Sequence, residues 1–205
     1  MGMPAAAVAA SKLIYSFRPR LVAVVGICAG VRGKTEIGDI LVADPCFDWG
    51  AGKWLKNPGS DAIQFHPAAY QWRLDESLRV AARAVADTPG VLSRIHESFS
   101  GERPAQQPKV VIDAMASGAS VLQAATTMKD VREQHKSLVG IEMESCAVFT
   151  AVEYSSEPRP KCISIKSVCD FGDESKSDIA HAYAAHTSSN FLYEFAITSL
   201  VEVQV

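Results

Sequence analysis

Acidic side chains directly follow two short apolar runs, and these acids have the types and spacing best suited to chemistry. Residues 138–141 are apolar and lead into Glu142 and Glu144, and the largely apolar run 162–169 ends on Asp170. Apolar runs of this length are typical of buried strands, and α/β proteins bind small molecules beyond the carboxyl ends of their strands. The pattern therefore predicts a small-molecule site at one rim of a sheet.

Each of these acids has a structural alternative beside its functional reading. Glu142 and Glu144 are two residues apart, so in an extended segment they point to the same side, and at a helix start they would complement the positive end of the dipole. For Glu142 both readings stay open. Glu144 is the better functional candidate, because a carboxylate accepts hydrogen bonds from two neighbouring hydroxyls such as a sugar diol. Asp170 is expected either to donate a proton from a partly desolvated strand end or merely to begin a loop.

Length and composition bound the class of protein. The chain has 205 residues and a mass of 22.0 kDa, is 48% hydrophobic, and contains no apolar run long enough to cross a bilayer. It is therefore predicted to form one globular domain over residues 1–205. A formal charge of -3 without a basic cluster gives no electrostatic footprint for nucleic acid or an anionic membrane. Small molecules are the expected partners.

The cysteines and histidines show no metal or disulfide pattern. The five cysteines are odd in number and lack CxxC spacing, and the histidines lack metal-ligand spacing. We therefore predict no disulfide framework, no metal and no cofactor. The Ala-rich start has no preceding basic residue and is a poor signal peptide, so a cytoplasmic location is expected.

Apolar periodicity predicts helices that alternate with strands. Such alternation indicates an α/β fold with a largely parallel sheet that helices cover on both faces. Residues 26–30 are expected to form a turn with little side-chain bulk, which lets the backbone approach a ligand or simply makes a tight turn. The stretch 45–70 is expected to be a long loop or lid. The predicted helices span residues 6–17, 74–85, 91–99, 128–135, 145–154 and 182–200, the strands 21–25, 40–43, 110–112, 138–141 and 161–168, and the other loops 100–108 and 171–178.

Taken together, these blocks resemble the nucleoside phosphorylase and nucleosidase superfamily, which includes purine nucleoside phosphorylase, uridine phosphorylase and methylthioadenosine/S-adenosylhomocysteine nucleosidase. Residues 1–6 are similar to the family's glycine-led helix start, and residues 25–30 with 37–40 to its glycine turn and following strand. The most specific matches are residues 141–144 (IEME), similar to V-E/D-M-E, and 167–170 (SVCD), similar to [AS]-[IV]-[SC]-D. The resemblance covers nearly the whole chain and implies a three-layer sandwich with a central mixed, mostly parallel sheet.

The resemblance also implies roles for individual residues and a homo-oligomeric assembly. Met143 would pack against a ribose, Glu144 would bind its hydroxyls with Glu142 beside it, and Asp170 would protonate or hydrogen-bond N7 of a purine as the catalytic acid. The remaining site residues that it implies are Val121, Leu122, Cys169 and Ala29 around the base, and Ile27, Cys28 and Gly30 in the turn that faces water or an anion.

Departures from the family pattern shape the expected function. Val24 and Ile27 stand where phosphorylases place an arginine and a hydroxyl residue for phosphate, which favours hydrolysis by water. Val121 stands where an aromatic usually stacks on the base. The family's opening strand, with the glutamate that activates water in nucleosidases, has no counterpart in the sequence, so a chain that lacks this N-terminal segment is expected. We predict hydrolysis of the N-ribosidic bond of a nucleoside of the methylthioadenosine or adenosylhomocysteine type. The alternatives are a phosphorylase, or a nucleoside-binding sensor domain without turnover.

Overall fold

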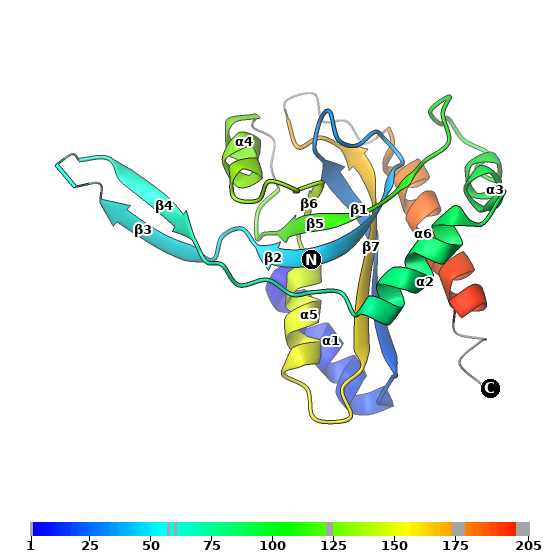
Figure 1. The fold of residues 1–205 in the computed structure, drawn as a ribbon, viewed down its shortest axis with the longest axis horizontal. Coiled ribbons are helices and arrows are strands. Elements are labelled where there is room, and N and C mark those ends of the chain that lie inside the picture. The colour runs from blue at the N-terminus through cyan, green and yellow to red at the C-terminus, as the bar shows by residue number, and fades with distance from the viewer. Residues whose placement is uncertain (1, 57, 60, 122–124, 174–178, 200–205) are drawn as a thin grey trace.

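The fold is a strongly twisted sheet that closes on itself, with helices packed around it (Figure 1). The computed structural model describes residues 2–56, 58–59, 61–121, 125–173 and 179–199. In this part of the chain the closed sheet has the strand order β1-β6-β5-β2-β7, and a separate hairpin, β3–β4, extends from it. The strands are β1 (Leu21–Gly30), β2 (Ile40–Asp48), β3 (Gly52–Lys56), β4 (Ile63–Pro67), β5 (Val110–Ser117), β6 (Gly140–Glu142) and β7 (Lys161–Asp170). The helices are α1 (Met3–Phe17), α2 (Glu76–Asp87), α3 (Val91–Glu97), α4 (Ala125–Glu133), α5 (Ser145–Glu153) and α6 (His181–Ser199).

The sheet is mixed, with parallel pairing predominant. β1 pairs in parallel with β7, and β5 pairs in parallel with both β2 and β6. The pairs β1–β6 and β2–β7 are antiparallel. The predicted α/β class with a mixed, mostly parallel sheet and covering helices is confirmed. Closure of the sheet is an additional feature, and it arises because β7 pairs with both β1 and β2.

Two of the three apolar clusters among the described residues cover opposite faces of β2. Ile40 and Val42 of β2 pack with α2, α3 and α6, whereas their neighbours Leu41 and Ala43 pack with α1 and α5. Alternate residues of a strand point to opposite faces, so a strand that is covered on both sides is continuously apolar. This accounts for the unbroken apolar runs of the sequence. Among the described residues, no helix is both long and apolar enough to cross a membrane.

The prediction of a turn at residues 26–30 is wrong. These residues continue β1, with Gly26, Ile27 and Cys28 paired to residues 166–168 of β7. The small side chains serve packing, because a Cβ atom on Gly30 would lie 2.7 Å from Cγ1 of Val168. Local composition indicated a turn, but pairing with a strand about 140 positions later determines the backbone.

The prediction of one long loop over residues 45–70 is also wrong. β2 runs on to Asp48, and β3 and β4 then form an antiparallel hairpin whose residues are mostly exposed. Three glycines and three prolines interrupt this stretch and hide the short alternating pattern of the two strands. The polar loop predicted for residues 171–178 lies within the described residues only at 171–173.

Gly38 provides a test of the junction before β2. Its φ is +89°, and a Cβ atom there would overlap the ring of the buried Tyr183. We expect Gly38→Ala to lower the free energy of unfolding by about 2–4 kcal/mol, because the left-handed backbone and the overlap both oppose the methyl group. Urea denaturation monitored by circular dichroism measures the change.

Gly33→Ala is the matched control for this substitution. Gly33 has a similar φ of +80°, but no described heavy atom lies within 4 Å of the added Cβ position. The loss there should be only about 1 kcal/mol, since backbone strain acts alone. Equal losses at the two glycines would contradict the packing argument at Tyr183.

Asp75 provides a second test, at the start of α2. Its carboxylate accepts hydrogen bonds from the backbone N–H of Ser77 at 2.9 Å and from Lys161 Nζ at 2.9 Å. The hydrogen bonds from Ser77 and Lys161 lower the pKa of Asp75 to about 2. Asp75→Ala should therefore cost about 1 kcal/mol of stability at pH 7, as expected for loss of a helix N-cap.

The pH dependence gives the sign of this effect. A carboxyl whose pKa is lower in the folded protein contributes stability above its unfolded pKa of about 3.9, and that contribution is lost as the pH falls through about 2. The difference in unfolding free energy between wild type and Asp75→Ala should therefore shrink between pH 5 and pH 2, measured by thermal melts across this range. A difference that stays constant would show that the charge of Asp75 is not involved.

Candidate functional site

The strand register brings the two acidic segments to one rim of the sheet. Ala29 of β1 lies opposite Asp170 of β7 on one side and opposite Ile141 of β6 on the other. Because neighbouring strands are about 4.8 Å apart, Asp170 and Ile141 are roughly 10 Å apart, and Glu142 follows Ile141 directly. The residue between the two acidic segments is therefore Ala29, whose side chain is a single methyl group.

A β-bulge sets the position of Asp170. Cys28 pairs with Val168, but the next residue, Ala29, pairs with Asp170, so Cys169 is the extra residue of β7. Bulges of this kind redirect side chains at sheet rims and near active sites. Without the extra residue, the strand alternation would place Cys169 opposite Ala29.

The carboxylate of Asp170 is buried and held by its own strand end. Its Oδ1 accepts a hydrogen bond from the N–H of Gly172 at 2.7 Å, and its Oδ2 accepts one from the Cys169 thiol at 3.4 Å. The same thiol lies 3.4 Å from the carbonyl oxygen of Cys28. Asp170 is thus oriented by short-range contacts on the two paired strands.

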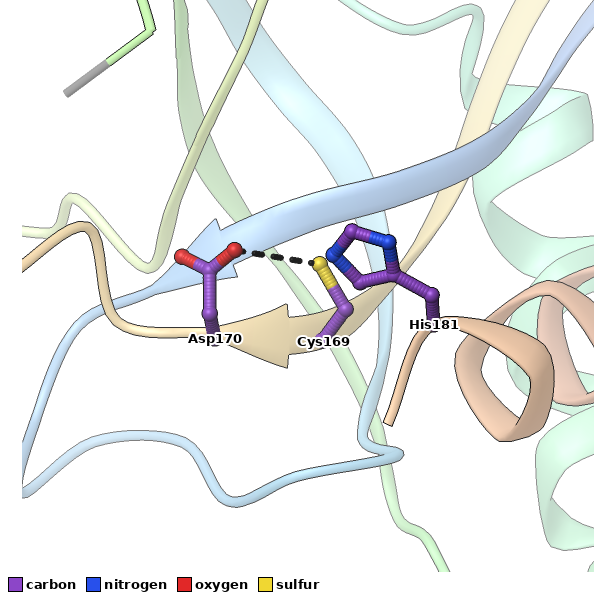
Figure 2. Close-up of side chains that lie close together, drawn as sticks. All are labelled: Cys169, Asp170 and His181. Atoms are coloured by element: carbon purple, nitrogen blue, oxygen red, sulfur yellow. Dashed lines mark hydrogen bonds between the residues drawn. The ribbon is translucent and has the colours of Figure 1, made fainter. Parts of the chain in front are cut away.

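His181, the first residue of α6, lies beside this pair (Figure 2). One donor atom each from Cys169, Asp170 and His181 fall within 4.8 Å of one another, and sulfur, oxygen and nitrogen are ligands that zinc accepts. Zinc binds the thiolate, however, whereas the Cys169 sulfur lies 3.4 Å from two acceptor oxygens, the Cys28 carbonyl and Oδ2 of Asp170, and such surroundings suit a protonated thiol. The geometry is that of a hydrogen-bonded acid. The spacing of the histidines did not indicate a role for His181.

Glu142 anchors the start of α5. It is buried, and its carboxylate accepts hydrogen bonds from the N–H of Glu144 at 3.0 Å, from the N–H of Ser145 at 2.9 Å and from the hydroxyls of Ser117 and Ser145. Burial opposes ionisation, but the nearby Lys166 ammonium and these hydrogen bonds hold the pKa of Glu142 below its usual value. These protein partners fit the capping alternative for Glu142. A ribose contact at Glu142 stays a prediction.

Lys166 is a site residue that the sequence reasoning missed. Its side chain is only 4% exposed, and its Nζ lies 3.0 Å from Oε2 of Glu142 and 3.2 Å from Oε2 of Glu144. Burial opposes protonation, but the two carboxylates outweigh it and raise the pKa of Lys166. Gly26 lies opposite Lys166 on the paired strand, and a Cβ atom there would lie at ordinary contact distance, 3.5 Å from Nζ. A single charged residue within the apolar run 162–169 was the available signal.

Glu144 is the more accessible member of this cluster. Its side chain is 28% exposed, its Oε1 accepts a hydrogen bond from the N–H of Gly2 at 3.1 Å, and its Oε2 contacts Lys166. Gly2 caps α1 and Glu144 occupies the N-cap position of α5, so the carboxylate lies at the positive ends of two helices. Met143 is half-buried beside Gly2. Glu144 and Met143 are therefore partly exposed at the rim of the sheet.

The remaining expected site residues differ in their burial. Cys28 is buried in the core under α1 and α5, and Gly30 lies against Thr35 and Val168. A contact of either residue with water or an anion stays a prediction. Ile27 and Ala29 are half-buried along β1. Val121 is 55% exposed. Leu122 lies outside the described residues.

Comparison with known sequences gives the following relatives. A family model described as the phosphorylase superfamily matches residues 1–200. The uncharacterized protein y4jS of Sinorhizobium fredii (strain NBRC 101917 / NGR234) is 33% identical over 201 residues, covering 98% of this chain and 48% of that protein. ATP nucleosidase Cap17 of Escherichia coli (strain KTE188) is 23% identical over 187 residues, covering 84% of this chain and 35% of that protein. The chain thus spans about half or less of the length of these curated relatives.

Solved structures share the fold. A 5'-methylthioadenosine/S-adenosylhomocysteine nucleosidase from Colwellia psychrerythraea 34H, in complex with adenine, has a TM-score of 0.74 at 18% identity, over 97% of this chain and 75% of that chain. Futalosine hydrolase of Helicobacter pylori strain 26695 has a TM-score of 0.68 at 19% identity, over 96% and 76%. At these identities the structures establish the fold alone, whereas the family match covers nearly the whole sequence. The chain belongs to the phosphorylase superfamily.

Proposed function

We propose that the protein hydrolyses the N-ribosidic bond of a purine nucleoside of the methylthioadenosine or adenosylhomocysteine type. One observation carries the proposal: Ala29 lies between Asp170 on one neighbouring strand and the segment that leads to Glu144 on the other. A nucleoside has a polar base edge and a polar diol that are separated by the bond to be broken. An acid on each side of a small side chain suits both ends of such a ligand.

The ribose is proposed to bind at Glu144 and Met143. Glu144 keeps lone pairs beyond those that accept from Gly2 and Lys166, since a carboxylate has about four acceptor sites. A 2'-hydroxyl and a 3'-hydroxyl would each donate to one of its oxygens. The Met143 side chain supplies an apolar contact for the sugar face.

The base is proposed to bind over Ala29, with Asp170 at its N7 edge. The glycosidic bond breaks through an oxocarbenium-like transition state, in which negative charge develops on the departing base. A proton from Asp170 to N7 would neutralise that charge as the bond between the base and the anomeric carbon breaks. Water would then add to that carbon and release a proton, which restores the acid form of Asp170. Cys169 and the N–H of Gly172 hold the two carboxyl oxygens in place for this step. Asp170 is accordingly the proposed catalytic acid.

Hydrolysis is favoured over phosphorolysis by the residues along β1. Val24 packs against the apolar cluster under α1 and α5, and Ile27 is half-buried, so neither side chain offers a donor for phosphate. The relatives support the same choice, since ATP nucleosidase and methylthioadenosine/S-adenosylhomocysteine nucleosidase are named for nucleosidase activity. Phosphorolysis is the second candidate reaction, and a product analysis distinguishes it from hydrolysis.

A product analysis with and without phosphate tests the reaction. The protein is incubated with methylthioadenosine, adenosylhomocysteine, adenosine, inosine and ATP, and the products are separated by liquid chromatography. We expect free base and the free sugar moiety at equal rates in both conditions. Formation of a ribose 1-phosphate would replace the proposal with phosphorolysis. Binding of a nucleoside without any product would indicate a nucleoside-binding domain instead.

Asp170→Asn tests the acid. We expect kcat to fall by at least about 100-fold, because an amide cannot transfer a proton, with the melting temperature close to that of wild type since the side-chain shape is kept. Asp113→Asn on β5 is the matched control and should keep wild-type kcat, because Asp113 accepts a hydrogen bond from its neighbour Ala114 and lies outside the rim. An Asp170→Asn protein with unchanged kcat would remove Asp170 from the acid role.

A further inference from the structure

The ammonium group of Lys166 is buried, and a contribution to stability does not by itself explain why a lysine occupies this position. Its side chain is 4% exposed, and burying an ammonium ion costs several kcal/mol unless its partners are well placed. One partner, Glu142, already accepts hydrogen bonds from Ser145 and from the N–H of Glu144. Replacing a buried ion pair with apolar residues is often neutral or stabilising. Stability alone is therefore weak grounds for a lysine at this position.

The second partner of Lys166 is the half-exposed carboxylate of Glu144. Lys166 Nζ contacts Oε2 of Glu144 at 3.2 Å, and the N–H of Gly2 contacts Oε1 at 3.1 Å. Each oxygen thus has one contact from the protein, and the two contacts come from different elements, β7 and the start of α1. A carboxylate held at both oxygens has its remaining lone pairs in defined directions.

We infer that Lys166 is a positioning residue for the sugar diol: its ammonium fixes the Glu144 carboxylate so that both oxygens can accept hydrogen bonds from the 2'- and 3'-hydroxyls. This inference rests on the proposed binding of a nucleoside and adds a residue that does not itself touch the ligand. Glu142 takes part by holding the ammonium from the buried side, at 3.0 Å.

Charge balance explains why a neutral residue in place of Lys166 would not hold Glu144 ready for the diol. Glu142 and Glu144 both lie within 3.2 Å of the same nitrogen, so removal of the ammonium would leave two carboxylates close together and partly desolvated. Such pairs take up a proton. A protonated carboxyl has a donor where the diol needs an acceptor. Loss of Lys166 should therefore damage recognition of the diol and leave recognition of the base intact.

The test compares three ligands that differ only in the sugar. Dissociation constants for adenosine, 3'-deoxyadenosine and adenine are measured by calorimetry in the Asp170→Asn background, where turnover is expected to be at least about 100-fold slower. With Lys166 intact, adenosine should bind at least about tenfold more tightly than 3'-deoxyadenosine, the range expected for a hydrogen bond to a charged group. In Lys166→Met this preference should fall to within about threefold, while adenine affinity stays the same.

Matched variants separate charge from packing. Lys166→Arg keeps the positive charge and should keep most of the preference for adenosine. Gly26→Ala places a methyl group at ordinary contact distance, 3.5 Å from Nζ, and should leave all three affinities unchanged. If Lys166→Met does not fold, as judged by its thermal melt, Lys166→Met with Glu142→Gln removes the two opposite charges together. That double variant leaves no pair of carboxylates to take up a proton, but Glu144 still lacks its contact at Oε2, so the preference should again fall to within about threefold.

The outcomes distinguish this inference from the proposed function. A preference for adenosine that survives in Lys166→Met, or a loss of affinity that is equal for adenosine and adenine, overturns the positioning role and leaves the proposed function standing. The absence of any preference with Lys166 intact contradicts both, because Glu144 would then not bind the diol.

Discussion

The buried ion cluster of Lys166, Glu142 and Glu144 joins the parts of the molecule on which the site depends. Lys166 comes from β7, Glu142 ends β6, and Glu144 begins α5 and also contacts the N–H of Gly2 at the start of α1. Buried charges are tolerated only when each has its partners, since an uncompensated one costs several kcal/mol. The register of two strands and the approach of two helices must therefore be set together, and the rim of the sheet is fixed as one unit.

Glu142 and Glu144 have different roles because their surroundings differ. Glu142 and Glu144 are two positions apart, but one is buried and hydrogen-bonded by serines and backbone groups, and the other is 28% exposed. The buried acid has a firm structural role because its oxygens are satisfied internally. The exposed acid keeps acceptor capacity toward solvent. A second carboxylate that supports the first is a common requirement where a ligand-binding group must be held in one orientation.

The sequence predicted those features whose causes are local. Apolar periodicity located the helices and the buried strands. The acids at the two strand ends do lie on either side of Ala29, while binding of a ligand there stays a prediction. The predictions from the sequence were wrong or incomplete where contacts between residues far apart in the chain determine the structure. Residues 26–30 have the composition of a turn but pair with β7 about 140 positions away, and Lys166 finds its carboxylate partners 22 and 24 positions earlier in the chain. His181 reaches Asp170 through the placement of α6, which no spacing in the sequence reveals.

The bulge at Cys169 shows how a short motif acquires physical meaning. β7 must remain in register with β1 through Val168 to bury its apolar side chains and Lys166, and it must also present Asp170 beside Ala29. A regular strand would place Cys169 opposite Ala29, because regular pairing advances by one residue on each strand. The extra residue resolves this conflict at the cost of one unpaired position, and the Cys169 thiol occupies it with contacts to Cys28 and Asp170. A small residue with a weak donor suits that position, since it fills little space and still supports the acid.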